Sequence, residues 1–306
     1  MRLLFAGTPA AALPSLAALR EAGHEVVAVA TNPDAHRGRG RQLAPSPVAA
    51  EAARLGLPLL QPVRAREQWF IDAVTELAPD LAVVVAWGTL VPDSLLAVPA
   101  HGWVNLHFSL LPAWRGAAPV QRAIMAGDRT TGVTTFRLVH DLDAGPVYRQ
   151  EATAIGDDET AGELLARLAA VGARVLVGTV ADIASDATPQ PQPEGEITLA
   201  PKVTPDEARI NWTTPATTIH NLVRGVTPDP GAWTSLHGRR LKILRVKPWA
   251  HSGLAPGQVL ATKTEVLVGT KGVAVRLMEV QPEGKPPMEA SAWARGARLN
   301  PGDRFE

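Results

Sequence analysis

The chain has 306 residues, of which 46% are apolar and 20% are charged. This balance is typical of a globular protein with a sizeable core and excludes a disordered chain, while the length favours two domains. The absence of cysteine excludes disulfides, a thiolate metal site and a thiol nucleophile, and it suits a cytoplasmic protein. The formal net charge of zero hides an asymmetry. Residues 1–205 hold 16 basic and 21 acidic side chains, a net of −5, and residues 206–306 hold 14 and 9, a net of +5.

The N-terminus predicts a βαβ unit, with a strand over residues 2–6, a helix over residues 10–22 and a strand over residues 25–30. The turn after the first strand, Gly7-Thr8-Pro9, lacks the G-x-G-x-x-G spacing, which argues against a dinucleotide site and a dehydrogenase. The same turn ends the first apolar run before it reaches the length of a signal peptide. The longest apolar run, residues 81–87, is too short to span a membrane, so we expect a soluble protein without a membrane partner.

Residues 32–47 carry Arg37, Arg39 and Arg41, separated by glycines and bounded by prolines. This composition predicts a long exposed loop without a strand or helix. The default interpretation is a solvated linker, but three guanidinium groups on a mobile backbone also suit phosphate contacts. Both interpretations stay open at this point.

Strands continue to alternate with helices as far as residue 183, which predicts an α/β fold with a Rossmann-like, doubly wound and mostly parallel sheet. Ser46 is placed to cap a helix that begins with Pro47 and ends near residue 55. The other predicted strands cover residues 57–60, 81–86, 102–108 and 132–139, and the other predicted helices cover residues 66–78, 119–126 and 160–183.

The strand over residues 102–108 carries the candidate active site. Its alternation places Asn105 and His107 on one face, and Pro112 and Gly116 then break the strand. Open α/β sheets bind ligands at such strand ends. A lone buried histidine is usually structural, but a second polar residue on the same face favours a shared function. Asp143 lies further on, before a Gly-Pro pair, where it could form a local turn or join the polar pair; both remain open here.

These residues and their order resemble the 10-formyltetrahydrofolate-dependent formyltransferases. Asn105-x-His107 runs into Ser-Leu-Leu-Pro-x-x-Arg-Gly-x-x-Pro, and Leu-Asp-Ala-Gly-Pro follows around Asp143. The Gly-Thr-Pro turn after the first strand also matches. The resemblance implies 10-formyltetrahydrofolate as co-substrate, and the chemistry needs no metal. It further implies that the catalytic residues are Asn105, His107 and Asp143, that the folate-binding residues are Ser109, Leu110, Leu111 and Pro112, and that the tRNA-binding residues are Arg37, Arg39 and Arg41.

Residues 188–195 alternate proline with polar residues, a stretch too rich in proline to pack, so we expect a linker over residues 188–206. This divides the chain into a catalytic domain, residues 1–187, and a C-terminal domain, residues 207–306. Short segments broken by Gly and Pro predict a small OB-like β-barrel in the second domain, with strands over residues 240–246, 257–260, 265–268 and 273–277. Its positive charge suits either a silent capping domain or contact with a polyanion.

The C-terminal domain adds its own resemblance. Ala200-Pro-Lys-Val, Ile210-Asn-Trp and Pro228-x-Pro-Gly-Ala are similar to segments of the C-terminal domain of methionyl-tRNA formyltransferases, although Pro286-Pro287 departs from the expected turn. The resemblance implies transfer of a formyl group from the folate to the α-amine of initiator methionyl-tRNA, by a cytoplasmic monomer. Three alternatives remain: a formyltransferase for a small amine such as an amino sugar, a formyl-folate hydrolase, and a non-catalytic RNA-binding protein. The basic loop and barrel disfavour the first two, and the Asn-His-Asp set disfavours the third.

Overall fold

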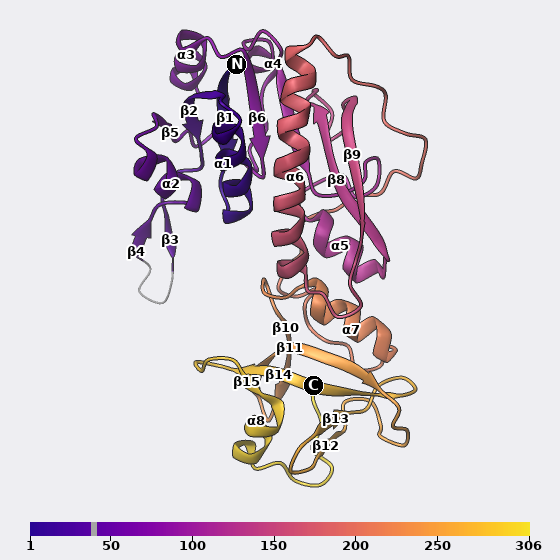
Figure 1. Cartoon of the computed structure of the whole chain (residues 1–306). Coiled ribbons are helices and arrows are strands. Elements are labelled where there is room, and N and C mark those ends of the chain that lie inside the picture. Colours follow the sequence, from indigo (N-terminus) through magenta and orange to yellow (C-terminus); the bar gives the residue numbers. More distant parts are fainter. Residues whose placement is uncertain (38–41) are drawn as a thin grey trace. The chain divides into compact units, whose positions relative to one another are not determined.

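The computed structural model describes residues 1–37 and 42–306, which form two units (Figure 1). The first unit comprises Met1–Pro119, Thr130–Ala154 and Leu165–Ala200, and the second comprises Val120–Arg129, Ile155–Leu164 and Pro201–Glu306. The expected domain boundaries at residues 187 and 207 stay a prediction, which truncation can test.

A seven-stranded sheet forms the core of the first unit, in the order β5-β2-β1-β6-β7-β8-β9. The first five strands are parallel, and β8 and β9 are antiparallel to their neighbours. The central strands are continuous apolar runs because both of their faces are covered. The Rossmann-like, mostly parallel sheet is therefore confirmed. Its strands are β1 (Arg2–Gly7), β2 (Glu25–Ala30), β5 (Leu59–Leu60), β6 (Leu81–Val85), β7 (Trp103–His107), β8 (Thr130–Arg137) and β9 (Val147–Ala154).

Helices connect these strands, and the predicted cap of the second α-helix is confirmed. The Ser46 hydroxyl accepts the backbone N–H of Ala49 at 2.9 Å, which satisfies one of the free donors of the first turn. Two elements were not predicted from the sequence. They are α4, a single turn without apolar periodicity, and β9, an edge strand in which every residue after Val147 is exposed or half-buried. The helices before α6 are η1 (Ala10–Ala12), α1 (Leu13–Glu21), α2 (Pro47–Leu55), α3 (Gln68–Leu77), α4 (Asp93–Leu96) and α5 (Pro119–Ala126).

Helix α6 (Ala161–Ala184) is the one helix in the described part of the chain that is long and apolar enough to cross a membrane. It is instead a core helix on the sheet. Leu168, Leu176 and Val180 are fully buried, and the buried hydroxyl of Thr179 lies 2.7 Å from that of Thr135 in β8. Its apolar length is therefore explained by packing within a folded unit.

One sequence expectation about the basic loop is wrong. Within residues 32–47, β3 (Ala35–Arg37) pairs antiparallel with β4 (Gln42–Ala44), so the segment contains a short hairpin. Composition missed it because backbone pairing in a local hairpin does not need apolar side chains. Arg37 ends β3, whereas Arg39 and Arg41 lie outside the described residues.

The proline-rich residues 188–200 were expected to be unable to pack, but they belong to the first unit and pair with it. Gln190 exchanges backbone hydrogen bonds with Val147 at 2.6 and 2.8 Å, and Arg115 exchanges them with Thr198 and Ala200 at 2.9 and 2.7 Å. Proline stiffens the backbone without removing the N–H groups of the residues between the prolines. These residues supply the pairing, and they bring the segment to the loop that follows β7.

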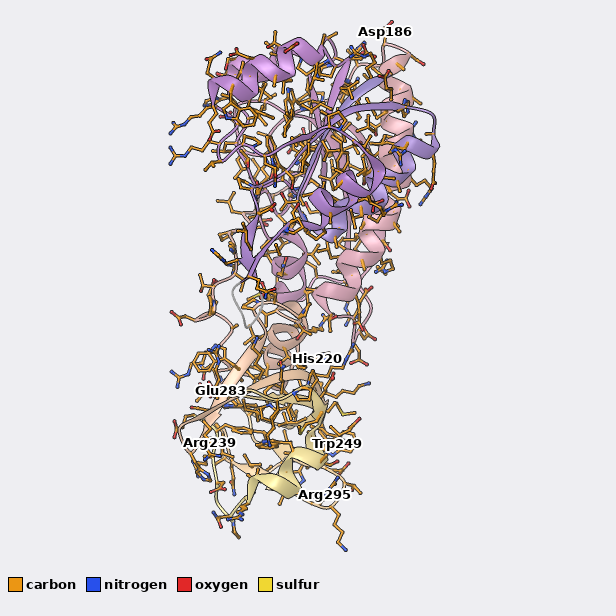
Figure 2. All side chains as sticks on the ribbon, turned by 90° about the vertical axis from the view of Figure 1, so that its left-hand side faces the viewer. Asp186, His220, Arg239, Trp249, Glu283 and Arg295 are labelled. Carbon is orange, nitrogen blue, oxygen red and sulfur yellow. The ribbon has the colours of Figure 1, made fainter. Side chains whose placement is uncertain are left out.

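The second unit is built on an antiparallel sheet in the order β10-β11-β14-β13-β12, with β15 beside β14. Residues 303–306 join its two edges, because Val259 donates to the Asp303 carbonyl at 2.9 Å and Glu306 donates to that of Ser235 at 3.0 Å. The expected barrel-like C-terminal sheet is thus present. Arg239 and Trp249 mark the two ends of its longest strand in Figure 2. The strands are β10 (Ala232–Leu236), β11 (Arg239–Trp249), β12 (Val259–Ala261), β13 (Val266–Val268), β14 (Ala274–Pro282) and β15 (Met288–Glu289).

Two helices of the second unit had no prediction, α7 (Ala216–Gly225) and α8 (Ala290–Ala297). Helix α7 buries Ile219 and Val223 but carries threonine, histidine and asparagine on its other positions. Apolar side chains recur over only two turns of this polar segment, and so short a periodic pattern cannot be distinguished from a loop.

Candidate active site

A cavity of about 380 Å³ lies at the carboxyl ends of β6 and β7. The three residues expected to be catalytic, Asn105, His107 and Asp143, all line it. Asn105 and His107 come from the same face of β7, as their spacing predicts, and Asp143 comes from the loop between β8 and β9. Open α/β sheets bind their ligands at the carboxyl ends of the strands, so this edge of the sheet is the expected place for a ligand cavity.

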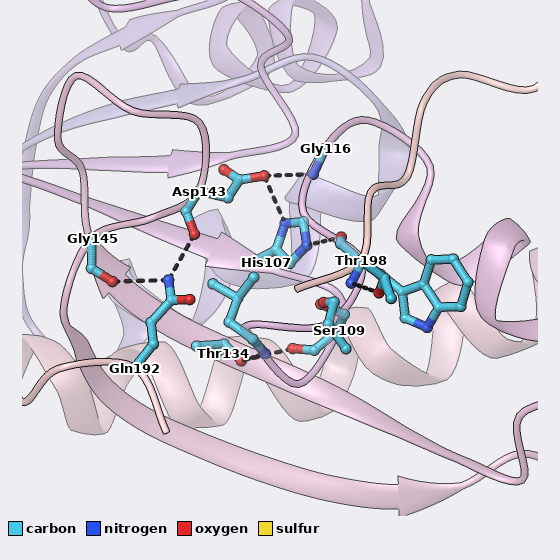
Figure 3. A network of polar contacts seen from close by, with 11 residues as sticks. His107, Ser109, Gly116, Thr134, Asp143, Gly145, Gln192 and Thr198 are labelled. Atoms are coloured by element: carbon cyan, nitrogen blue, oxygen red, sulfur yellow. Dashed lines mark hydrogen bonds and ion pairs between the residues drawn. The ribbon is translucent and has the colours of Figure 1, made fainter. Parts of the chain in front are cut away.

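The His107 ring is buried and is fixed through both nitrogens (Figure 3). Its Nε2 lies 2.8 Å from the carbonyl oxygen of Trp114, and its Nδ1 lies 3.7 Å from Oδ2 of Asp143. Because a carbonyl only accepts, the neutral ring carries its proton on Nε2 and leaves Nδ1 as the basic nitrogen beside the carboxylate. Burial lowers the pKa of His107, and the Asp143 charge and the Trp114 hydrogen bond oppose that effect.

Asp143 occupies a tight turn that aims its side chain at His107. Its φ of 48° is left-handed, and its Oδ2 also accepts the backbone N–H of Gly116 at 2.8 Å. The turn requires Gly145, since a Cβ there would lie 1.8 Å from the carbonyl oxygen of Arg137. The two interpretations of Asp143 therefore combine: it forms a turn, and that turn delivers a carboxylate to the polar pair.

Two donors at the cavity have no partner among the residues that the structure describes. The Asn105 carboxamide makes no hydrogen bond within that part of the chain, and the buried Nε1–H of Trp87 makes none either. Buried polar groups are normally paired. An unpaired carboxamide and an unpaired indole N–H at one cavity therefore favour a polar ligand that accepts from them.

The residues expected to bind folate, Ser109, Leu110, Leu111 and Pro112, do not line the cavity within the described chain. They form the buried base of the loop that follows β7. Leu111 donates to the hydroxyl of Thr134 at 3.1 Å, that hydroxyl donates to the Ser109 carbonyl at 2.7 Å, and Gln150 donates to the Leu111 carbonyl at 2.7 Å. Folate contact by these four residues stays a prediction, and so does tRNA contact by the arginines of the basic loop.

Several cavity residues were missed from the sequence. Trp87 to Leu90 follow β6 directly, and Leu90 and Leu142 are 83% and 55% exposed. The carboxyl end of the buried strand over residues 81–86 was a signal that could have placed the first of these segments at the site. The described residues contain no group of three or more histidine, aspartate or glutamate side chains that could hold a metal ion.

Solved structures share this fold. HypX from Aquifex aeolicus, in complex with tetrahydrofolic acid, superposes with a TM-score of 0.66 at 20% identity over 97% of this chain. The match covers 47% of HypX, so the chain spans about half the length of that protein. A methionyl-tRNA formyltransferase from Clostridium thermocellum has a TM-score of 0.56 at 15% identity, over 81% of this chain and 93% of that one.

Sequence comparison is more specific. The formyl transferase family model matches residues 1–180, and the model of the formyl transferase C-terminal domain matches residues 202–298. A methionyl-tRNA formyltransferase from Thermobifida fusca is 54% identical over 100% of this chain and 99% of its own length. A second relative of the same name, from Acidothermus cellulolyticus, is 53% identical over the full length of both chains. The chain therefore belongs to the formyl transferase family and, within it, to the methionyl-tRNA formyltransferases.

Proposed function

We propose that the chain transfers the formyl group of 10-formyltetrahydrofolate to the α-amine of initiator methionyl-tRNA. The observation that carries the proposal is the convergence of Asn105, His107 and Asp143 on one cavity. The name of the 54% identical relative supports the acceptor, and the tetrahydrofolic acid complex of HypX supports a folate in this fold.

The reaction exchanges one C–N bond for another. The amine nitrogen attacks the formyl carbon, the bond from that carbon to N10 breaks, the amine loses a proton and N10 gains one. Negative charge develops on the formyl oxygen during the attack. The carboxamide of Asn105 is the donor that can stabilise that charge, because it lines the cavity and no other described group uses its N–H groups.

His107 and Asp143 supply the base. Because burial lowers the pKa of His107, the ring is neutral near pH 7 and can accept the amine proton. The carboxylate at 3.7 Å stabilises the ring once it is charged, and the Trp114 carbonyl holds the ring in place through Nε2. The proton then passes to N10 of the leaving folate.

The basic segments are assigned to the transfer RNA. Arg37, Arg39 and Arg41 lie close together in the sequence, and the second unit adds arginines on its sheet. Arg240 lies 4.1 Å from the ring centroid of Trp233, a contact that holds its guanidinium group at a defined place. Phosphates bind such groups through charge and hydrogen bonds.

The test is a formylation assay with purified protein, 10-formyltetrahydrofolate and methionyl-tRNA, with formylmethionine measured after hydrolysis of the ester. We expect product only when both substrates are present. A nucleotide-linked amino sugar in place of the transfer RNA should stay unmodified. Formylation of the sugar alone would establish the sibling activity instead, and release of formate without an acceptor would establish a hydrolase.

We also infer that the protein acts in the cytoplasm as a monomer. The absence of cysteine and the packing of α6 within a folded unit support the cytoplasmic part of this assignment. Light scattering of the purified protein measures the oligomeric state, and a mass of twice the chain would contradict it.

A further inference from the structure

Gln192 connects three parts of the active-site region. Its Nε2 donates to the backbone carbonyls of Asp143 at 2.7 Å and Gly145 at 3.0 Å. Its Oε1 accepts from the guanidinium group of Arg115 at 2.6 Å. Figure 3 shows the first two bonds on either side of the Asp143 turn. All three partners lie within loops that border the cavity.

Few side chains of the segment that holds Gln192, residues 192–198, face the protein. Gln192 and Thr198 are half-buried, whereas the residues between them are exposed. Thr198 accepts the backbone N–H of Trp114 at 2.8 Å, and Trp114 in turn offers its carbonyl to His107. The two inward-facing side chains of the segment therefore contact the two loops that hold His107, one on the Asp143 side and one on the Trp114 side.

The Asp143 turn needs such a support. Asp143 is left-handed at a φ of 48°, a conformation that a non-glycine residue adopts only when its surroundings impose it. The carbonyl of Asp143 itself and that of Gly145, two residues further on, both accept from the one carboxamide. The residue whose carboxylate lies 3.7 Å from His107 Nδ1 is thus bonded by a side chain 49 residues away along the chain.

We propose that Gln192 is a positioning residue for the transfer reaction, which holds the Asp143 turn so that its carboxylate faces His107 and the N–H of Gly116. This role rests on the proposed formyl transfer. Gln192 itself lies outside the cavity lining in the described chain. Its effect is therefore expected in turnover rather than in substrate binding.

Three variants test the hydrogen bonds of the Gln192 side chain. Gln192→Ala removes all of them. Gln192→Glu keeps the length and the acceptor for Arg115 but loses both donors and places oxygen against two carbonyls. Gln190→Ala is the matched control, because the side chain of this exposed glutamine in the same segment bonds, among the described residues, only to the nearby Thr188 carbonyl at 3.3 Å.

We expect Gln192→Ala and Gln192→Glu to lower kcat on the order of tenfold or more, with KM for both substrates within about twofold, since a small misplacement of a catalytic group reduces rate more than affinity. Gln190→Ala should match the parent. In an Asp143→Ala background, Gln192→Ala should cost less than about twofold, because residues that act through one group are not additive. A full additional loss there, or a rise in KM alone, would overturn the role.

A second readout needs no turnover. The ring of His107 can be followed by NMR against pH, with its signal identified by its loss in His107→Gln. The Asp143 carboxylate raises the pKa of His107 against the effect of burial, and Asp141 and His140 border the same cavity. Gln192→Ala should therefore move the midpoint to lower pH, and Gln190→Ala should not. An unchanged midpoint contradicts the positioning role, whereas an inactive parent contradicts only the proposed function.

Discussion

Asn105, His107 and Asp143 differ in how the fold holds them. His107 and Asp143 are fixed by each other and by backbone groups of the loop after β7, whereas the Asn105 carboxamide has no partner within the described residues. The first two are therefore preorganised for proton transfer, and the third is available to a ligand. This division suits a reaction in which one group must accept a proton while another stabilises a developing charge.

Replacement of any one of the three with alanine should lower kcat on the order of 10²-fold or more, the usual loss for a general base or an oxyanion donor. KM for the folate should change much less. His101→Ala is the control, since this histidine lies before β7, at the opposite end of the strand from His107. Steady-state kinetics on all four variants makes the comparison, and near-normal turnover in the three cavity variants would exclude these roles.

The stability of the protein should depend on the titration of His107. Burial holds the pKa of His107 below its ordinary value of 6.5, so between the two values the unfolded chain binds more protons than the folded one. The free energy of unfolding should then decrease as pH falls below about 6.5. His107→Gln cannot gain that proton and should lose less stability than the parent over this range. Thermal unfolding at a series of pH values measures the difference.

Two other histidines should contribute to the remaining pH dependence of that variant. Burial also lowers the pKa of His24 and of His220, and both rings are unchanged in His107→Gln. The plots of melting temperature against pH for the parent and for His107→Gln should therefore approach each other above about pH 6.5 and separate below it. Curves that stay parallel would show that His107 titrates alike in the folded and unfolded chains.

The sequence predicted the residues that meet at the cavity better than it predicted the residues that form hydrogen bonds to the surrounding loops. The period of two in β7 was sufficient to place Asn105 and His107 together, because strand alternation depends only on local geometry. Gln192 and Gln150 could not be found in this way. Each reaches the site through a contact between distant segments, with carbonyl partners that carry no sequence signal. Only the resemblance to a family brought Asp143 to the same site.

At the scale of elements, buried strands and capped helices were predicted well. Ser46 and Pro47 predicted the start of α2, since each has a specific backbone role, and the structure shows a left-handed Gly56 at its end. Elements without an apolar period were missed, among them α7 and the β3-β4 hairpin. Their polar sequences resemble loops, and only pairing or packing with neighbours distinguishes them.

The basic segment that holds Arg37, Arg39 and Arg41 gives a prediction at this scale. If Arg37, Arg39 and Arg41 bind phosphates of the acceptor end, their triple replacement with alanine should weaken transfer-RNA binding by about 1 kcal/mol or more for each phosphate that is no longer bound. The dependence of affinity on salt should also flatten, by nearly one unit of slope for each of these phosphates. Binding assays at several salt concentrations measure both.

Two results would give the loop a different role. Folate affinity should be the same in the parent and the triple variant, and a loss there would indicate a damaged fold. Arg64→Ala, at an exposed arginine of the same unit, is the matched control for a change of charge alone. Equal affinity and an equal salt slope in parent and triple variant would identify the loop as a solvated linker.

At the scale of the whole chain, charge and chemistry are divided along the sequence. The cavity and all three catalytic candidates lie in the first unit, within the first 205 residues that carry a net charge of −5. The following residues carry a net of +5. If the basic part of the chain attracts a polyanionic substrate and the cavity holds the folate, affinity for transfer RNA and for folate should be separable.

Two truncations test that separation and the contribution of the proline-rich segment. A fragment of residues 1–200 keeps Gln192, Thr198 and the backbone pairing of Ala200 with Arg115, whereas a fragment of residues 1–188 lacks them. Both should bind transfer RNA much more weakly than the full chain. The longer fragment should bind tetrahydrofolate more tightly, because it alone keeps the backbone pairing of residues 190–200 with Val147 and Arg115, which no Gln192 variant removes. Calorimetry with tetrahydrofolate compares the two. Equal affinities would show that residues 189–200 do not shape the site, and absence of binding by both fragments would show that the first unit does not fold without the second.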